Sequence, residues 1–285
     1  MVRGIHTAAA GMSVMQSRMD IISNNMANVD LTSFKKDVAV MKSFPDIQIR
    51  RGQDDGLMAF PLGSYDTMPV VGKLGTGVEL NESFTVWEQG SLKETENDFD
   101  LALDGKGFMA VESERGERYT RNGSFTLDKE GFLVTKEGLK VLSEDDSHIQ
   151  IKENNFAIDK EGKIYVNKEY EGDPNRLVKK DENEWKEREY IGTLKIVRFP
   201  RERELRREGT SFYYADEFSG SPIVATGNKR PQVLQGFKES SNVNVVSEMV
   251  QMIEVQRLYD ANQKSIQSHD SLLSKSVNQV GIARG

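Results

Sequence analysis

The residues that could carry catalytic or metal chemistry are few and scattered. The chain has no cysteine, which excludes disulfides, thiolate nucleophiles and cysteine-ligated zinc or iron–sulfur sites. Its three histidines, His6, His148 and His269, lie far apart in the sequence, so we expect no metal site. The run Gly72–Gly77 lacks the spacing of a phosphate-binding loop, and the sequence contains no Gly-x-Ser-x-Gly nucleophile elbow.

Acidic residues could serve as general acids or as calcium ligands, but their number weakens both interpretations. With 45 Asp and Glu, a group such as Asp98, Asp100 and Asp104 is no evidence of a catalytic carboxylate pair. The tetrapeptide Asp-Lys-Glu-Gly occurs at 128–131 and 159–162. It lacks the ligand pattern of a calcium loop and is typical of a hairpin turn. We therefore expect no catalytic residue and no cofactor, and an enzyme is the weaker hypothesis.

Charge and hydropathy exclude two further classes. The 285-residue chain carries 38 Lys and Arg against 45 Asp and Glu, a net charge of -7, whereas nucleic acid favours a basic surface. No apolar stretch approaches the roughly 18–20 residues that cross a bilayer, and the N-terminus lacks the apolar region of a signal peptide. We expect a soluble chain with no transmembrane segment and no cleavable signal peptide.

The first thirty residues have the clearest periodicity. Apolar residues recur there at alternating spacings of three and four, the a/d pattern of a coiled-coil helix. They are Ile5, Ala8, Met12, Met15, Met19, Ile22, Met26 and Val29. A helix with such a narrow apolar stripe is marginally stable alone, so it needs a partner. We predict an N-terminal assembly helix over residues 1–30.

Residues 241–285 supply a second helix of the same kind. Apolar residues occur there at seven-residue intervals, and further apolar residues widen the stripe. They are Val245, Met252, Tyr259, Ile266, Leu273 and Val280, with Val246, Met249, Ile253 and Val277 beside them. Asn244 suits the N-cap and Glu248 suits the first turn. The polar residues Gln256, Gln263 and Asp270 are either solvated flanks or positions that fix the register of a helix assembly.

The residues between these helices indicate extended structure. Residues 31–75 contain scattered proline and glycine without a sustained period and are expected to form an extended arm or linker. Residues 76–240 contain short β-rich runs separated by turn signals, which predicts a β-rich outer domain. A charge-rich insert is expected at about 140–200, with a strand over 191–197. The predicted fold is α+β, with the N- and C-terminal helices paired as a coiled coil and an inserted all-β domain of short strands.

Motifs spread over nearly the whole chain resemble the flagellar basal-body rod protein family (FlgF/FlgG type) and the related hook proteins. The longer runs are 8–12, 23–29, 32–35, 75–78, 89–92, 95–103, 105–108, 119–125, 234–236 and 241–244. The motif residues singled out are Asn24, Asn25, Ala27, Asn28, Gly105, Gly107, Phe108, Ser241, Asn242 and Asn244. Two positions depart from the pattern, because Ser33 replaces the usual glycine and Met109 replaces a second aromatic residue. Because of Ser33, the sequence does not define the conformation of the turn after the N-terminal helix.

The resemblance implies a structural subunit of the axial rod of the bacterial flagellar basal body. It implies that the terminal helices pair and polymerise, that the β domain lies outside them, and that the polymer transmits torque. The implied partners are further copies, other rod or hook proteins and the flagellar type III export apparatus, and the implied location is the periplasmic rod. The short arm and the charge-rich insert favour the proximal rod type, and the distal type is the alternative.

A protein of a different class is the rival hypothesis. A free periplasmic or extracellular β-domain enzyme or adhesin could also have helical ends. Such a protein would need a pocket with converging polar groups and would not self-associate. Sedimentation at increasing concentration separates the two hypotheses.

Overall fold

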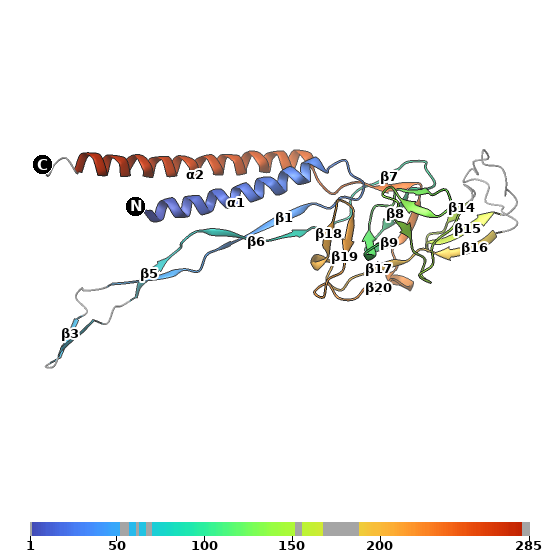
Figure 1. The fold of residues 1–285 in the computed structure, drawn as a ribbon, viewed down its shortest axis with the longest axis horizontal. Helices are drawn as coiled ribbons and strands as arrows, with labels where there is room; N and C mark the ends of the chain where they lie inside the picture. The colour runs from blue at the N-terminus through green and yellow to red at the C-terminus, as the bar shows by residue number, and fades with distance from the viewer. Residues whose placement is uncertain are drawn as a thin grey trace. The chain divides into compact units, whose positions relative to one another are not determined.

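The fold is α+β, with a helix at each end of the chain and a β-rich region between them (Figure 1). It was obtained as a computed structural model, which describes residues 2–51, 57–60, 63–66, 70–151, 156–167 and 188–280. The backbone divides into two compact units. Unit 1 combines Met1–Met26, Asp37–Phe84 and Val245–Gly285, and unit 2 combines Ala27–Lys36 and Thr85–Asn244.

The two helices of unit 1 run antiparallel, side by side (Figure 1). Helix α1 (Val2–Ala27) has 26 residues and α2 (Val245–Val280) has 36. A β-carbon added to Gly4 would lie 2.6 Å from Nε2 of His269, and one added to Gly11 would lie 3.0 Å from Nδ2 of Asn262. A step of seven residues toward the C-terminus of α1 thus matches a step of seven residues toward the N-terminus of α2, as expected for antiparallel helices. The missing side chains of these two glycines allow the helices to approach closely.

The rest of unit 1 is a ribbon of paired strands. β1 (Asp37–Ser43) pairs with β6 (Val78–Thr85), β2 (Ile47–Arg50) with β5 (Val70–Leu74), and β3 (Leu57–Phe60) with β4 (Gly63–Asp66). We call β1–β6 together the arm. Between β5 and β6, Gly77 has φ +147°, and a β-carbon there would lie 3.1 Å from Cβ of Ala10. The glycine therefore lets the arm contact α1.

The largest sheet of unit 2 comprises, among the described residues, nine strands in which β9 is central. β9 pairs with β10, β13 and β17, and all of these pairs are antiparallel. The strands are β9 (Phe108–Ser113), β10 (Gly116–Thr120), β11 (Phe125–Leu127), β12 (Leu133–Thr135), β13 (Lys140–Val141), β17 (Ile196–Arg198), β18 (Arg206–Glu208), β19 (Phe212–Tyr214) and β20 (Ile223–Val224).

Smaller ladders complete unit 2. β14 (Phe156–Ile158), β15 (Lys163–Asn167) and β16 (Arg188–Thr193) form a three-stranded sheet. β8 (Leu101–Asp104) pairs with β21 (Gln232–Gln235), and β7 (Leu92–Glu94) pairs with β22 (Phe237–Glu239). Single 3₁₀ turns occur at Glu202–Glu204 and Gly227–Lys229. Residues 168–187 of the expected charge-rich insert lie outside the described residues.

The core of unit 2 consists of two apolar clusters. One is mainly aliphatic and surrounds β9, where Met109 and Val111 are fully buried. The other is aromatic and contains Phe108, Phe199 and Tyr213. The Trp87 ring lies edge-on to Phe108 at 4.9 Å between centroids. Because neighbouring residues of β9 point to opposite faces, this strand supplies side chains to both clusters.

The repeated Asp-Lys-Glu-Gly tetrapeptides form the same hairpin turn twice, as predicted. The first joins β11 to β12 and the second joins β14 to β15. Gly131 N–H donates to Asp128 O at 2.9 Å, and Gly162 N–H donates to Asp159 O at 2.7 Å. Both glycines have φ near +78°, and each Asp carboxylate accepts the N–H of the following lysine. The aspartates therefore stabilise turns.

The single strand predicted over 191–197 is wrong. β16 ends at Thr193 and β17 begins at Ile196, and the two strands belong to different sheets. Leu194 N–H donates to Gly162 O and Lys195 N–H donates to Leu142 O. The chain thus crosses between sheets within a continuous run of strand-forming residues, a change that periodicity does not reveal.

Candidate functional site

The face of α2 that contacts α1 has a seven-residue period. Its half-buried residues are Val245, Met252, Tyr259, Ile266 and Leu273. A second series at the same period lies between them: Glu248 and Val255 are buried, and Asn262 and His269 are half-buried. Because this second series includes polar residues, the apolar periodicity of the sequence does not indicate it. The side chain of Val280, the last helical residue, lies outside the described residues.

The buried stripe of α1 differs by part of a turn from the one the periodicity indicates. Ala8 and Ile22 are buried, as are Gly11, Val14 and Asn25, which the apolar pattern missed. The other residues of the predicted stripe, Ile5, Met12, Met15, Met19, Met26 and Val29, are half-buried. Val29 lies beyond the end of α1 at Ala27. The signal that could have revealed this stripe is the heptad spacing of Gly4 and Gly11, with Ala8 between them.

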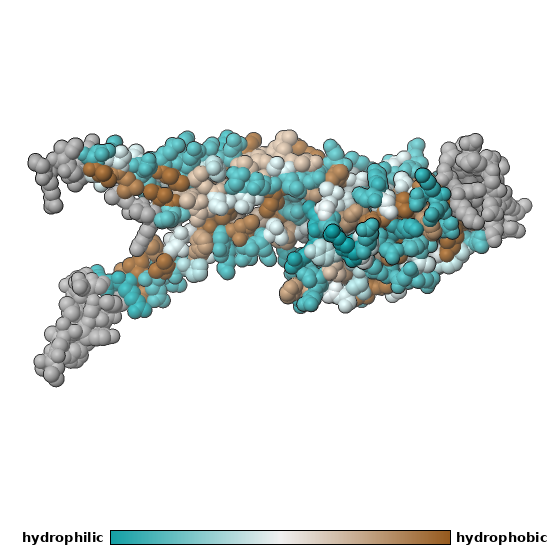
Figure 2. Space-filling model, viewed as in Figure 1, coloured by the Kyte–Doolittle hydropathy of each residue, from teal (hydrophilic) through white to brown (hydrophobic). Residues whose placement is uncertain are grey.

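Part of the predicted α2 stripe lies away from α1. Val246 and Val277 are each 71 % exposed, and Met249 and Ile253 are about half exposed, at 47 % and 51 %. The polar residues Gln256, Gln263 and Asp270 are also exposed. Figure 2 shows apolar surface along the helices and on the neighbouring strands of unit 1. Unit 1 therefore presents apolar helix surface that its described residues leave exposed.

Asn25, one of the family-motif residues, fixes the end of α1 to the start of β1. Its Nδ2 donates to Asp37 O at 2.9 Å, and its Oδ1 accepts from Asp37 N at 3.0 Å. The residue is only 2 % exposed. A side-chain amide is both donor and acceptor, so it satisfies both backbone groups of one residue. Asn24 and Ala27 are exposed, and Asn28 O accepts from Leu31 N.

Ser33 adopts the left-handed backbone conformation, with φ +59°. This conformation explains why glycine suits the position, because a β-carbon is strained there. The serine is buried, and its Oγ donates to Arg121 O at 2.7 Å. Its N–H donates to Glu239 O at 2.8 Å. A hydrogen bond therefore compensates for the strain at the position where the family pattern is broken.

Three charged side chains are buried together in unit 2. Lys35, Arg121 and Glu239 are 0 %, 6 % and 1 % exposed. Lys35 Nζ lies 2.5 Å from Oε1 of Glu239, and Arg121 Nη1 lies 3.4 Å from Oε2. We call these residues the buried junction, because they join the segment after α1 to the strand that precedes α2. Periodicity missed it, because charged residues are rarely buried unless paired.

Backbone groups complete the buried junction. Lys35 Nζ also donates to Glu88 O at 2.6 Å, Arg121 Nη2 donates to Gly105 O at 2.6 Å, and Gly90 N–H donates to Glu239 Oε1 at 2.9 Å. Burial lowers the pKa of the Lys35 ammonium, and Arg121 adds to this effect, whereas Glu239 opposes it. The single carboxylate of Glu239 therefore compensates two cations.

Asn242 is a second connection between these segments. Its Oδ1 accepts from Lys36 N at 2.8 Å, and its Nδ2 donates to Val86 O at 2.9 Å. Ser241 Oγ accepts from Val243 N, and Asn244 directly precedes α2. The C-terminal motif thus ties residues 36, 86 and 242 into one hydrogen-bonded group.

The central motif residues shape the core. Gly105 and Gly107 have φ +120° and +154°, and a β-carbon on either would lie within 3.2 Å of Pro231 or Ile196 atoms. Phe108 is 1 % exposed within the aromatic cluster. The two glycines therefore leave no room for a β-carbon, and the Phe108 ring is constrained by packing.

Asp100 and His148, two of the residues that could carry chemistry, have structural partners. Buried Asp100 accepts from Thr95 Oγ1 at 2.8 Å and pairs with Lys238 at 3.0 Å. His148 contacts the Glu112 carboxylate. Within the described part of the chain, no group of three His, Cys, Asp or Glu could hold a metal ion, and no helix is long and apolar enough to span a membrane.

Replacing Ser33 tests its balance of strain and hydrogen bonding. Ser33→Ala keeps the left-handed strain and loses the Arg121 contact, so we expect a loss of about 1–2 kcal/mol in unfolding free energy. Ser33→Gly loses the contact but relieves the strain, so it should remain within about 1 kcal/mol of the original. Urea unfolding measures both values. A glycine variant less stable than the alanine variant would contradict this account.

The fold and its junction define a class of protein: one whose two terminal helices lie together while a β-rich region is inserted between them. Three family models match the chain in this order. They are the flagella basal body rod protein (residues 5–35), the flagellar hook protein FlgE/F/G D1 domain (102–166) and the flagellar basal body rod FlgEFG protein C-terminal region (234–280).

Curated relatives match over nearly their whole length. The flagellar basal-body rod protein FlgG of Buchnera aphidicola is 34 % identical over 278 residues, covering 96 % of this chain and 98 % of the relative. FlgG of Borreliella burgdorferi is 31 % identical, covering 98 % of both chains. The flagellar hook-basal body complex protein FlhO of Bacillus subtilis is 29 % identical, covering 99 % of both.

The chain belongs to the flagellar basal-body rod protein family. The resemblance inferred from the motifs is confirmed. The family is one of structural proteins rather than enzymes.

Proposed function

We propose that the chain is a structural subunit of the axial rod of the flagellar basal body and polymerises through its terminal helices. In this proposal α1 and α2 pair as a coiled coil within one chain, and the apolar surface left uncovered binds further subunits. The observation that carries it is the exposure of Val246, Met249 and Ile253 on α2, with the half-buried Met12 and Met19 on α1.

The mechanics follow from the kind of contact. A contact between different surfaces of identical subunits does not close on itself and generates a helical filament. Many helix contacts acting together would transmit torque along such a filament. Methionine suits this surface, because its flexible side chain adapts to neighbours in slightly different positions.

The position along the rod is inferred from the relatives. The sequence favoured the proximal type (FlgF), but both relatives above 30 % identity named here are called FlgG, the name of the distal type. These names support the distal position. The proposed partners are further copies, other rod and hook proteins and the type III export apparatus, and the proposed location is the periplasmic part of the basal body.

Charged substitutions in the helix stripes test the proposal. Met19→Asp and Ile266→Asp each place a carboxylate in a half-buried helix face, where an unpaired charge is strongly unfavourable. In a motile host that lacks its own copy of the gene, we expect the original chain to restore rods and swimming and neither variant to do so. Electron microscopy of isolated basal bodies and swimming assays measure this.

The matched controls carry the same new charge on exposed positions. Ser23→Asp on α1 and Gln267→Asp on α2 should assemble normally, because both positions are exposed. In a Trp185→Phe background, the fluorescence of Trp87 in the aromatic core reports whether unit 2 is still folded. Normal rods with Met19→Asp or Ile266→Asp would contradict the proposal, as would a chain that stays monomeric in sedimentation at every concentration.

A further inference from the structure

The first two turns of α2 carry an apolar stripe on the side away from α1. Val246, Met249, Val250 and Ile253 are 71 %, 47 %, 52 % and 51 % exposed. Their spacing of i, i+3, i+4 and i+7 places them on one face, the pattern of a helix that docks in an apolar groove. At about 100° per residue, this face is opposite the one that holds buried Val255.

The same face becomes polar farther along α2. Three turns beyond Ile253 the equivalent position is Lys264, and Arg257 lies between them. The apolar stripe is therefore confined to the start of the helix. We call these four residues the α2 stripe.

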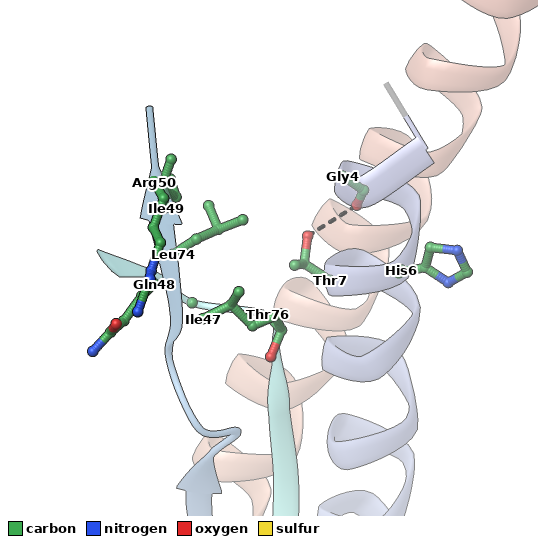
Figure 3. A pocket seen from close by; sticks show the side chains of 10 residues that line it. Gly4, His6, Thr7, Ile47, Gln48, Ile49, Arg50, Leu74 and Thr76 are labelled. Carbon is green, nitrogen blue, oxygen red and sulfur yellow. Dashed lines mark hydrogen bonds between the residues drawn. The ribbon is translucent and has the colours of Figure 1, made fainter. Parts of the chain in front are cut away.

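A second apolar surface of unit 1 lies between α1 and the arm. It is a cavity of about 630 Å³ lined by Gly4 and Thr7 of α1 and by Ile47, Ile49, Leu74 and Thr76 of the arm. Figure 3 shows Ile47 and Leu74 directed toward α1, whereas the His6 ring points away. Thr7 Oγ1 donates to Gly4 O at 3.0 Å, so this hydroxyl is satisfied within its own helix. Ile47, Ile49 and Leu74 form the aliphatic part of the lining, which also includes Gln48 and Arg50.

These two surfaces are far apart along one helix. Gly4 lies beside His269, sixteen residues beyond Ile253, which is about 24 Å of α-helix. One chain therefore cannot place its own α2 stripe in its own cavity. The stripe and the cavity are both apolar and lie at different heights along the helix pair. Such an arrangement allows the stripe of one copy to contact the cavity of the next copy.

We propose that the α2 stripe of one copy docks in the α1–arm cavity of the next copy, and this rests on the proposed function of polymerisation. Exposed Ile47 and Ile49, at 57 % and 41 %, would cover the stripe. Arg50 lines the cavity and Glu254 flanks the stripe, so these two rim charges have opposite sign, whereas Arg257 lies beyond the end of the stripe. Such rim charges orient the contact.

The cysteine-free chain allows a direct test by crosslinking. Copies with Ile253→Cys are mixed with copies with Ile47→Cys, assembled and oxidised mildly. A disulfide requires α-carbons about 4.4–6.8 Å apart, so we expect covalent dimers in the polymer on non-reducing gels. The matched control mixes Ile47→Cys with Lys264→Cys, which is on the same face of α2 but outside the stripe, and should give no dimer band.

A charge exchange gives an independent measurement. Ile253→Glu or Ile47→Lys alone should lower the assembled fraction about tenfold at fixed concentration, and both in one chain should restore it. Circular dichroism verifies that the helices remain formed.

The outcomes separate this inference from the proposed function. Three outcomes would overturn the docking assignment while leaving polymerisation in place. The polymer could form without the crosslink between positions 253 and 47, the control pair could crosslink equally, or the double variant could fail to restore assembly. An original chain that never polymerises would overturn both.

Discussion

Glu239→Ala is expected to lower the unfolding free energy of unit 2 by about 3–5 kcal/mol, because it leaves Lys35 and Arg121 buried beside each other without a counter-charge. Both cations are almost completely buried. The variant also removes the acceptor of the Gly90 N–H. The segment after α1 and the strand before α2 should then separate more easily than in the original chain.

Urea unfolding followed by Trp87 fluorescence measures this loss. A Trp185→Phe background makes Trp87 the only tryptophan, since the chain has two. Trp87 packs against Phe108 and Tyr213, so its emission reports on the core of unit 2. If the unfolding free energy of the variant and of the original chain falls with urea concentration at the same slope, only the stability has changed.

Lys35→Met is the matched comparison and should cost clearly less. It leaves Glu239 with Arg121 and with the Gly90 N–H. Burial lowers the pKa of Lys35, which means that burying its ammonium group costs free energy. Lys35→Met loses the attraction between Lys35 and Glu239 but also removes this desolvation cost, so the two effects partly cancel. If Lys35→Met were as destabilising as Glu239→Ala, the assignment of Glu239 as the shared counter-charge would be wrong.

Gly123→Ala is expected to destabilise unit 2 by more than about 3 kcal/mol, the upper range for overpacking a core. A β-carbon on Gly123 would lie 1.6 Å from the carbonyl oxygen of Leu101. That atom is backbone, so it cannot rotate away. Leu101 N–H donates to Gly123 O at 2.9 Å, and relief of the clash would break this contact between the two segments.

Gly116→Ala separates this steric effect from backbone strain. Gly116 has φ +102° with nothing within 4 Å of an added β-carbon, so only the conformational cost of about 1–2 kcal/mol is expected. The same fluorescence measurement ranks the two variants. Similar losses for both would indicate that the Leu101 carbonyl moves at little cost, against the rigid contact described here.

Local sequence signals determined several elements. The seven-residue period indicated α2, and its first residue directly follows Asn244. The Asp-Lys-Glu-Gly tetrapeptides specify their turns through glycine conformation and an aspartate side chain, all within five residues. These features could be predicted because each depends on neighbours in the sequence. The family, too, was evident from motifs spread along the chain.

Tertiary structure decided which faces are covered. The apolar period of α1 included Met12 and Met19, but the partner of α1 approaches at Gly4 and Gly11, where glycine allows close contact. Ser33 and Glu239 acquire their roles only when residues about ninety or two hundred positions apart meet at Arg121 and Lys35. The sequence by itself determined the helices, the turns and the family. The contacts between distant segments fixed the buried junction and left the α2 stripe exposed, because burial depends on which surfaces meet in three dimensions.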